Sequence, residues 1–275
     1  MADRRRAGTG RKAGDGRAAR PTGAPAPSGA VRASGARRAA ERTGRRSRRR
    51  TVGPGAPVAE ALGTFILLFF GVGTILAVGG AGAADQKIAI ALAFGLSILA
   101  AAYAFGHVSG AHLNPAVTIA QVVSGRLPAP AAVPYIVAQV VGALLGALAA
   151  RIAFGESVAL SATQPGAVGT GGAFLAEVVL GFILMLVVKG TAVDDRSEGP
   201  AAGMAIGLTI AAGHLAMIPV SGASFNPARS IASAVVGGEL SGLWIYLIAP
   251  VIGAVAAALL YENLLRTTRS PEEDA

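Results

Sequence analysis

Two short segments of the chain place polar side chains beside long apolar stretches. The phrase at 108–116, Val-Ser-Gly-Ala-His-Leu-Asn-Pro-Ala, recurs 112 residues later at 220–228 with seven of its nine residues identical, and Arg229 follows the second copy. The amide NH₂ of an Asn can donate to the oxygen of a passing water molecule, and so can a guanidinium. A charge inside a membrane segment is costly and by default functional. The pattern therefore indicates two polar interruptions that face a pore.

Each Asn-Pro-Ala triplet opens an apolar stretch of about ten residues, at 114–123 and 226–235. A bilayer crossing needs about 20 residues, so these stretches suit half-helices that re-enter the membrane. Asn is a strong N-cap, and Pro loses no hydrogen bond in the first turn. Two such N-termini meeting at the membrane centre would repel cations. The triplets are Asn114, Pro115 and Ala116, and Asn226, Pro227 and Ala228. Both Asn residues could act only as caps, but the repetition of the whole phrase favours a second role at the permeating molecule.

Long apolar segments predict the elements that position these residues. They lie at 58–79, 87–106, 133–153, 172–192, 201–218 and 241–264. Each is near the length of a transmembrane helix, so we expect an all-α membrane protein. The repeat also extends outside the two phrases, since Ala59-Glu60 recurs as Ala176-Glu177. Three spans in each half require the second half to insert upside down, which is an inverted repeat.

The basic charge of the chain belongs to its N-terminal segment. Hydrophobic residues make up 53% of the chain and mean hydropathy is +0.57, yet the net charge is +9. Residues 1–50 hold 16 Lys and Arg against three acids. We expect a disordered Arg-rich cytoplasmic tail over 1–56 and a short cytoplasmic tail over 266–275. The first tail could contact anionic lipid or nucleic acid, but a solvated arm that follows the positive-inside rule is the simpler interpretation.

The paired motifs, with Arg229 after the second, resemble the major intrinsic protein family of aquaporins and glycerol facilitators. The resemblance covers 57–265, with one repeat over about 57–155 and the other over about 172–265. It implies a right-handed bundle of six transmembrane helices and two re-entrant half-helices. It also implies one pore in each subunit of a homotetramer in the cell membrane, with both termini cytoplasmic.

The resemblance further implies a selectivity filter on the outer side of the pore. Its residues are Phe94, His214, Ala223 and Arg229. Phe and His narrow the opening, so this set favours water over a polyol. Ala223 stands where Thr or Cys is more usual. A glycerol facilitator is the alternative, although such proteins usually carry a smaller residue at position 214 and Asp where this chain has Ser230.

Other polar groups have expected supporting roles. The backbone carbonyls of the loops before the half-helices should face the pore as acceptors. These belong to Gly110, Ala111, His112, Leu113, Gly222, Ala223 and Ser224. Glu60 and Glu177 are predicted to be buried acceptors that hold those loops. Lys189, near the end of the fourth span, is expected to extend toward the membrane surface.

Three classes of function can be compared. An ion-coupled carrier needs membrane carboxylates along its pathway, and only Glu60 and Glu177 qualify. An enzyme is not supported, because no nucleophile, base and orienting group occur together. The sequence therefore predicts a passive water channel in the lipid bilayer, with transport of glycerol or other small neutral solutes as the alternative. We expect no cofactor, no metal ion and no nucleic-acid partner.

Overall fold

The structure, a computed structural model, describes residues 52–155, 158–197 and 199–266. All of them belong to the second of two compact units, Arg49–Ala275. The predicted N-terminal tail falls outside the described residues up to position 51, and the C-terminal tail does so from position 267. This second unit is described by itself.

The regular secondary structure of the described residues is entirely helical. Six helices are long and apolar enough to cross a membrane. They are α2 (Ala56–Ala77), α3 (Ala84–Ser109), α5 (Ala129–Phe154), α6 (Gly169–Val188), α7 (Ala202–Ser221) and α9 (Leu243–Leu260). The two shorter helices are α4 (Pro115–Val123) and α8 (Pro227–Gly237). The predicted all-α membrane fold with six spans and two half-helices is confirmed.

Short helical turns complete the chain. They are η1 (Val158–Ser161), η2 (Lys189–Val193), η3 (Gly199–Ala201) and η4 (Tyr261–Leu265). Two of them, η2 and η4, are π-helical turns that extend α6 and α9. Helix α5 begins four residues before the predicted span. Its Pro130 lies in the first turn, where a missing N–H costs no hydrogen bond.

The two halves of the bundle use the same close helix contacts. Helix α2 packs against α5, and α6 packs against α9 in the equivalent way. A Cβ atom added to Gly142 would lie 2.1 Å from the carbonyl oxygen of Ala61, and one added to Gly253 would lie 1.9 Å from that of Val178. Only glycine permits these backbones to approach so closely.

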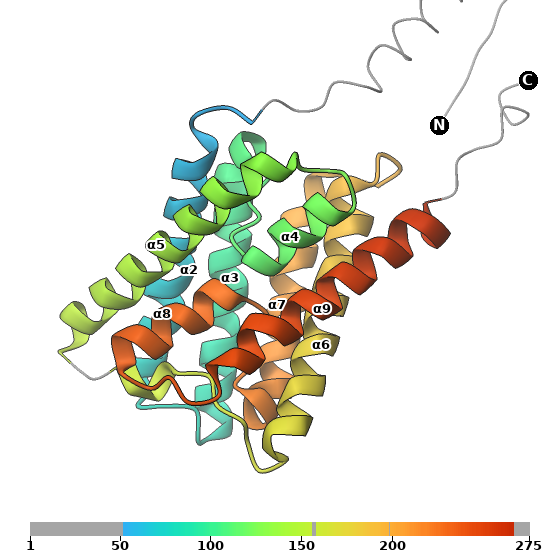
Figure 1. Cartoon of the computed structure of the whole chain (residues 1–275). Helices are drawn as coiled ribbons and strands as arrows, with labels where there is room; N and C mark the ends of the chain where they lie inside the picture. The colour runs from blue at the N-terminus through green and yellow to red at the C-terminus, as the bar shows by residue number, and fades with distance from the viewer. Residues whose placement is uncertain (1–51, 156–157, 198, 267–275) are drawn as a thin grey trace, which may run out of the picture. The chain divides into compact units, whose positions relative to one another are not determined.

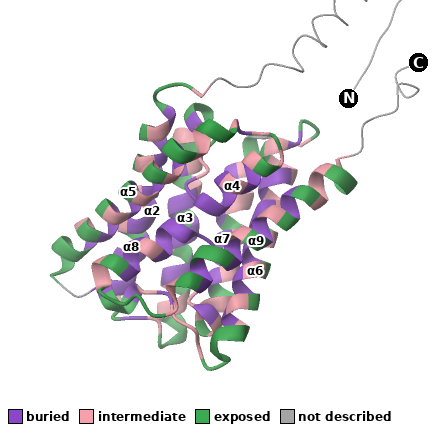
Figure 2. Cartoon of the chain, in the orientation of Figure 1, coloured by how far each residue is buried: buried purple, intermediate pink, exposed green. Residues whose placement is uncertain are grey.

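The half-helices lie inside the bundle, where α4 and α8 each contact both α5 and α9 (Figure 1). Buried residues gather where the helices face one another, and exposed residues lie on the outer faces (Figure 2). Many large apolar side chains are exposed there, including Ile152 and Leu175. Such an outer surface suits contact with lipid. The start of α2 and the end of α9 lie at the same end of the bundle (Figure 1).

Candidate functional site

The loops that lead into the half-helices have matching backbone conformations. Ala111 and Leu113 before α4 have φ of +46° and +51°, and Ala223 and Phe225 before α8 have φ of +49° and +59°. This left-handed region costs a residue with a side chain about 1–2 kcal/mol. Strong contacts must therefore hold each loop in place.

Glu60 supplies those contacts for the first loop. Its buried carboxylate accepts hydrogen bonds from Ser109 Oγ at 2.6 Å, from the backbone N–H of His112 at 2.9 Å and from that of Leu113 at 2.6 Å. Gln139 Nε2 donates a fourth bond at 2.7 Å. The four donors balance the cost of burying a charged group.

Glu177 holds the second loop in the same way. Its carboxylate, also buried, accepts from Ser221 Oγ at 2.7 Å, from the N–H of Ser224 at 2.8 Å and from that of Phe225 at 2.9 Å. Within the described residues these are three donors, one fewer than Glu60 has. The two acids are therefore equivalent in position but not in the number of their partners.

Asn114 and Asn226 cap the half-helices. The side-chain oxygen of Asn114 accepts from the N–H of Ala116 at 2.8 Å, and that of Asn226 accepts from the N–H of Ala228 at 2.9 Å. Pro115 and Pro227 occupy the first helical position behind each cap. Each cap satisfies a donor that a helix start would otherwise leave unpaired.

The amide nitrogens of the two Asn residues connect the loops to each other. Asn114 Nδ2 donates to the carbonyl oxygen of Phe225 at 2.9 Å, and Asn226 Nδ2 donates to that of Leu113 at 2.8 Å. The sequence did not indicate this reciprocal pair of bonds. It uses one of the two N–H donors of each amide and leaves the other for a further acceptor.

The four residues expected at the filter come from α3, α7 and the second loop with its half-helix. The rings of Phe94 and His214 stack with centroids 4.5 Å apart and an angle of 17°. Arg229 places its guanidinium carbon 5.2 Å from the centroid of Phe94. Ala223 is buried in the same hydrophobic cluster as Phe94. The fold therefore brings positions 94, 214 and 229 together.

Two polar atoms in this group have no protein partner within the described residues, namely His214 Nε2 and Arg229 Nε. His214 Nδ1 lies 2.8 Å from the carbonyl oxygen of Ile210, which can only accept, so Nδ1 carries the hydrogen. In the neutral form of the ring, Nε2 is then an acceptor. Arg229 Nη1 donates to the carbonyl oxygen of Ser161 at 2.7 Å and to Ser233 Oγ at 3.1 Å. These two buried atoms, an acceptor and a donor, are left for a small molecule.

The predicted pore carbonyls belong to the two loops between α3 and α4 and between α7 and α8. One of them, on Leu113, accepts the bond from Asn226. The side chain of His112 is not free either, because Nδ1 lies 3.1 Å from Thr118 Oγ1. No group of three His, Cys, Asp or Glu side chains in the described residues could hold a metal ion.

Sequence reasoning missed a hydroxyl network beside α8. Ser230 Oγ lies 2.7 Å from Thr163 Oγ1 and 2.6 Å from Ser224 Oγ. Together with the bond from Arg229 to Ser161, this network attaches the segment before α6 to the second half-helix. The segment at 158–168 carries no motif, so the sequence offered no signal for this role.

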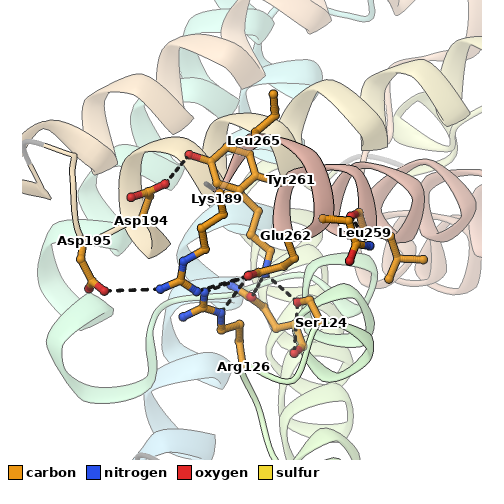
Figure 3. A network of polar contacts seen from close by, with 12 residues as sticks. Ser124, Arg126, Lys189, Asp194, Asp195, Leu259, Tyr261, Glu262 and Leu265 are labelled. Carbon is orange, nitrogen blue, oxygen red and sulfur yellow. Dashed lines mark hydrogen bonds and ion pairs between the residues drawn. The ribbon is translucent and has the colours of Figure 1, made fainter. Parts of the chain in front are cut away.

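Lys189 does not hold its ammonium in solvent, as a side chain that extends to the membrane surface would. It is fully buried, and its ammonium donates to Ser124 Oγ at 2.6 Å, Gln121 Oε1 at 3.1 Å and Glu262 Oε1 at 3.1 Å. Glu262 also accepts from Arg126 Nε at 2.9 Å (Figure 3). The reason is that the end of α4 and the turn after α9 supply partners that enclose the charge.

Comparisons with known proteins agree with this geometry. The family model of the major intrinsic protein matches residues 49–261. The chain is 41% identical over 217 residues to aquaporin NIP1-1 of Zea mays, covering 78% of this chain and 76% of that protein. It is 40% identical over 208 residues to the glycerol uptake facilitator protein-like 6 of Lactiplantibacillus plantarum, covering 73% and 94%.

A solved structure supports the fold. The X-ray structure of the aquaglyceroporin from Plasmodium falciparum matches with a TM-score of 0.71 and 24% identity, covering 77% of this chain and 96% of that one. The fold, the paired half-helices and the family match agree, and this chain belongs to the major intrinsic protein family.

Proposed function

We propose that the protein is a passive channel for small neutral solutes of the glycerol class and that it also conducts water. The observation that carries this proposal is the two-sided filter. Phe94 and Ala223 offer apolar contact, while His214 Nε2 and Arg229 Nε offer an acceptor and a donor. A polyol has a carbon face and a hydroxyl face, so it matches both sides.

The relatives also favour this proposal over strict water selectivity, which the sequence had put first. One relative of 40% identity is named as a glycerol uptake facilitator-like protein. Two other relatives, of 41% and 40% identity, are named as aquaporins NIP1-1 and NIP1-2. Small solutes are therefore the better-supported choice within the family.

Within the pore, we propose that the free N–H of Asn114 and that of Asn226 donate to the oxygen of the permeating molecule. The loop carbonyls would accept from its hydroxyl hydrogens. The N-termini of α4 and α8 carry partial positive charge, and Arg229 carries a full one. Together these charges oppose the passage of cations.

The hydrogen bonding of the two buried acids favours a passive mechanism over ion coupling. Glu60 accepts four hydrogen bonds and Glu177 accepts three, all from protein donors. A carboxylate that binds a transported proton or sodium ion must instead face the pathway. We assign both acids to holding the loops.

Strict water selectivity is the second candidate, and a specific observation favours it. The rings of Phe94 and His214 stack at 4.5 Å, and both are almost fully buried. Such contact leaves little room beside Arg229. Ser230 also differs from the Asp that is usual in glycerol facilitators.

Stopped-flow light scattering of reconstituted vesicles distinguishes the two candidates. Under a sucrose gradient, both predict faster shrinkage than in protein-free vesicles. Under a glycerol gradient, our proposal predicts a shrinkage phase followed by rapid re-swelling as glycerol enters. Re-swelling no faster than in protein-free vesicles, with fast water flow, would favour the water-selective candidate.

We also propose that 57–265 form the channel domain of a homotetramer in the cell membrane, with both termini cytoplasmic. The absence of cysteine in the sequence permits a direct test of orientation. Ser241, in the loop before α9, and Asp195, in the loop after η2, are both exposed, and each can be replaced by Cys. An impermeant maleimide added to intact cells should label the first variant only. The reverse pattern would invert the proposed orientation.

A further inference from the structure

Two phenylalanine rings stack on the imidazole of His214. One is Phe94, and the other is Phe225, whose ring centroid lies 5.5 Å from that of His214 at an angle of 16°. Phe225 precedes the second Asn-Pro-Ala triplet and is itself buried. Its side chain was not among the residues expected to act in the filter.

His214 needs such support because its own hydrogen bonding is sparse. Within the described residues, its ring forms one hydrogen bond, from Nδ1 to the carbonyl oxygen of Ile210, four positions earlier in the same helix. Its Nε2 has no protein partner there. One bond to its own helix leaves the ring able to tilt, so packing must fix its position.

Phe225 is held firmly enough to provide that packing. Its N–H donates to Glu177, and its carbonyl accepts from Asn114. Its ring rests on Gly213, where an added Cβ would lie 2.1 Å from Phe225 Cζ. Residue 225 therefore connects the central Asn pair to the filter.

The repeat provides an internal comparison. Leu113 occupies the equivalent place in the first loop, with a similar positive φ and an equivalent bond to Glu60. It packs on Gly63, where an added Cβ would lie 2.4 Å from Leu113 Cδ2. A leucine therefore satisfies this backbone in the half without the filter. The phenylalanine occurs only in the half that carries Arg229.

We propose that Phe225 is a positioning residue of the filter, which fixes the ring of His214 and thereby sets the largest solute that passes. This inference rests on the proposed role of Phe94, His214 and Arg229 in selectivity. In this proposal the side chain of Phe225 does not contact the solute. It acts by fixing the position of the His214 ring.

The test uses Phe225→Leu, because Leu113 shows that leucine tolerates the conformation. Permeability to water, glycerol and erythritol would be measured by stopped flow in reconstituted vesicles. We expect the ratio of erythritol to water permeability to rise about tenfold, the low end of what one methylene of pocket size changes. Phe174→Leu, which removes a ring from the pair with Trp244, is the matched control and should leave the ratio unchanged.

A double-mutant cycle with His214→Ala shows whether Phe225 acts through the imidazole. In the His214→Ala background, Phe225→Leu should no longer change the ratio of erythritol to water permeability. An equal change in both backgrounds would overturn the inference. The inference would also be overturned if His214→Ala changed the ratio and Phe225→Leu did not. In that case the proposed filter would still be supported. If His214→Ala alone has no effect, the proposed filter fails first and the inference fails with it.

Gly213→Ala is a second test of the inference, and it keeps both Phe225 and His214 in the chain. Its Cβ would displace the ring of Phe225, so we expect a rise in the same ratio. Loss of folding would lower water permeability together with that of every solute, and the ratio separates this outcome from a change in the filter. A folded Gly213→Ala channel with the original ratio would contradict the inference.

Discussion

Asn114 and Asn226 each donate an amide hydrogen to the backbone carbonyl of the residue that precedes the other. The two half-helix N-termini are therefore fixed to each other directly, in addition to the hold that each has on its own loop. Because the bonds are reciprocal, each half of the repeat holds the other where the two half-helices begin. Neither loop can shift without breaking a bond made by the other.

The reciprocal bonds predict a specific weakness in Asn226→Asp. Asp remains a good N-cap for α8, but it cannot donate to Leu113, so two acceptors would face each other. A buried acceptor left without its donor costs about 1–3 kcal/mol. Thermal unfolding in detergent should therefore occur at a lower temperature. Asn114→Asp should behave alike, and an unchanged unfolding temperature in both would contradict the role of these bonds.

The two buried acids should differ in their contribution to stability. In Glu60→Gln and Glu177→Gln, the new NH₂ group would face existing donors, at a cost of about 1–3 kcal/mol for each unsatisfied group. Glu60 has four donors and Glu177 has three. We therefore expect Glu60→Gln to lower the unfolding temperature further. The opposite order would show that the number of donors does not decide the effect.

The parts of this fold that sequence could predict are those set by local pattern. A span is fixed by its length of apolar residues, and a half-helix start is fixed by Asn-Pro, so both were found from neighbouring residues alone. The partners of Lys189 lie 65 to 73 positions away in the chain, on elements whose approach no local pattern describes. Its burial therefore required the structure.

The proposed filter was only partly predictable from the sequence. Phe94 and His214 were located by their register to the two triplets, which only the family resemblance made meaningful. The ring of Phe225 and the carbonyl of Ser161 complete the surroundings of His214 and Arg229. Neither group lies in a distinctive sequence motif. Which groups pack against His214 and Arg229 depends on the three-dimensional arrangement of the helices, and no local sequence pattern describes that arrangement.

The loop after η2 should keep its structure well into the acidic range. Asp194 accepts from Arg196 Nη2 at 2.6 Å and from Tyr261 Oη at 2.9 Å, and the bonds from Arg196 hold the pKa of Asp194 well below its usual range. Such a lowered pKa stabilises the fold above the unfolded value of about 3.9, and this contribution is lost as pH falls further.

Asp194→Asn provides the measurement. The difference in unfolding temperature between this variant and the parent should stay constant from about pH 7 to pH 5 and shrink below about pH 4. A difference that stays constant down to about pH 2 would mean that the pKa of Asp194 is not lowered by Arg196.

Arg229→Val tests the role of the charge in the proposed filter. The substitution removes the guanidinium and its bonds to Ser161 and Ser233, leaving an apolar and wider opening. We expect permeability to protons and to larger polyols to rise relative to water, as measured with a pH-sensitive dye and by stopped flow. Unchanged selectivity would contradict the position of the constriction.

In the ion cluster around Lys189, removal of the negative charge should lower the unfolding temperature more than removal of the positive charge. Glu262→Gln leaves the buried ammonium of Lys189 without a counter-charge, which typically costs about 3–5 kcal/mol. Lys189→Met removes the buried charge itself, and Glu262 keeps Arg126 and Arg266 as partners. Its cost should be much smaller. The double variant should then resemble Lys189→Met in unfolding temperature, since no isolated charge remains. If Lys189→Met were as damaging as Glu262→Gln, the contacts of the ammonium with Gln121 and Ser124 would have to matter more than its charge balance.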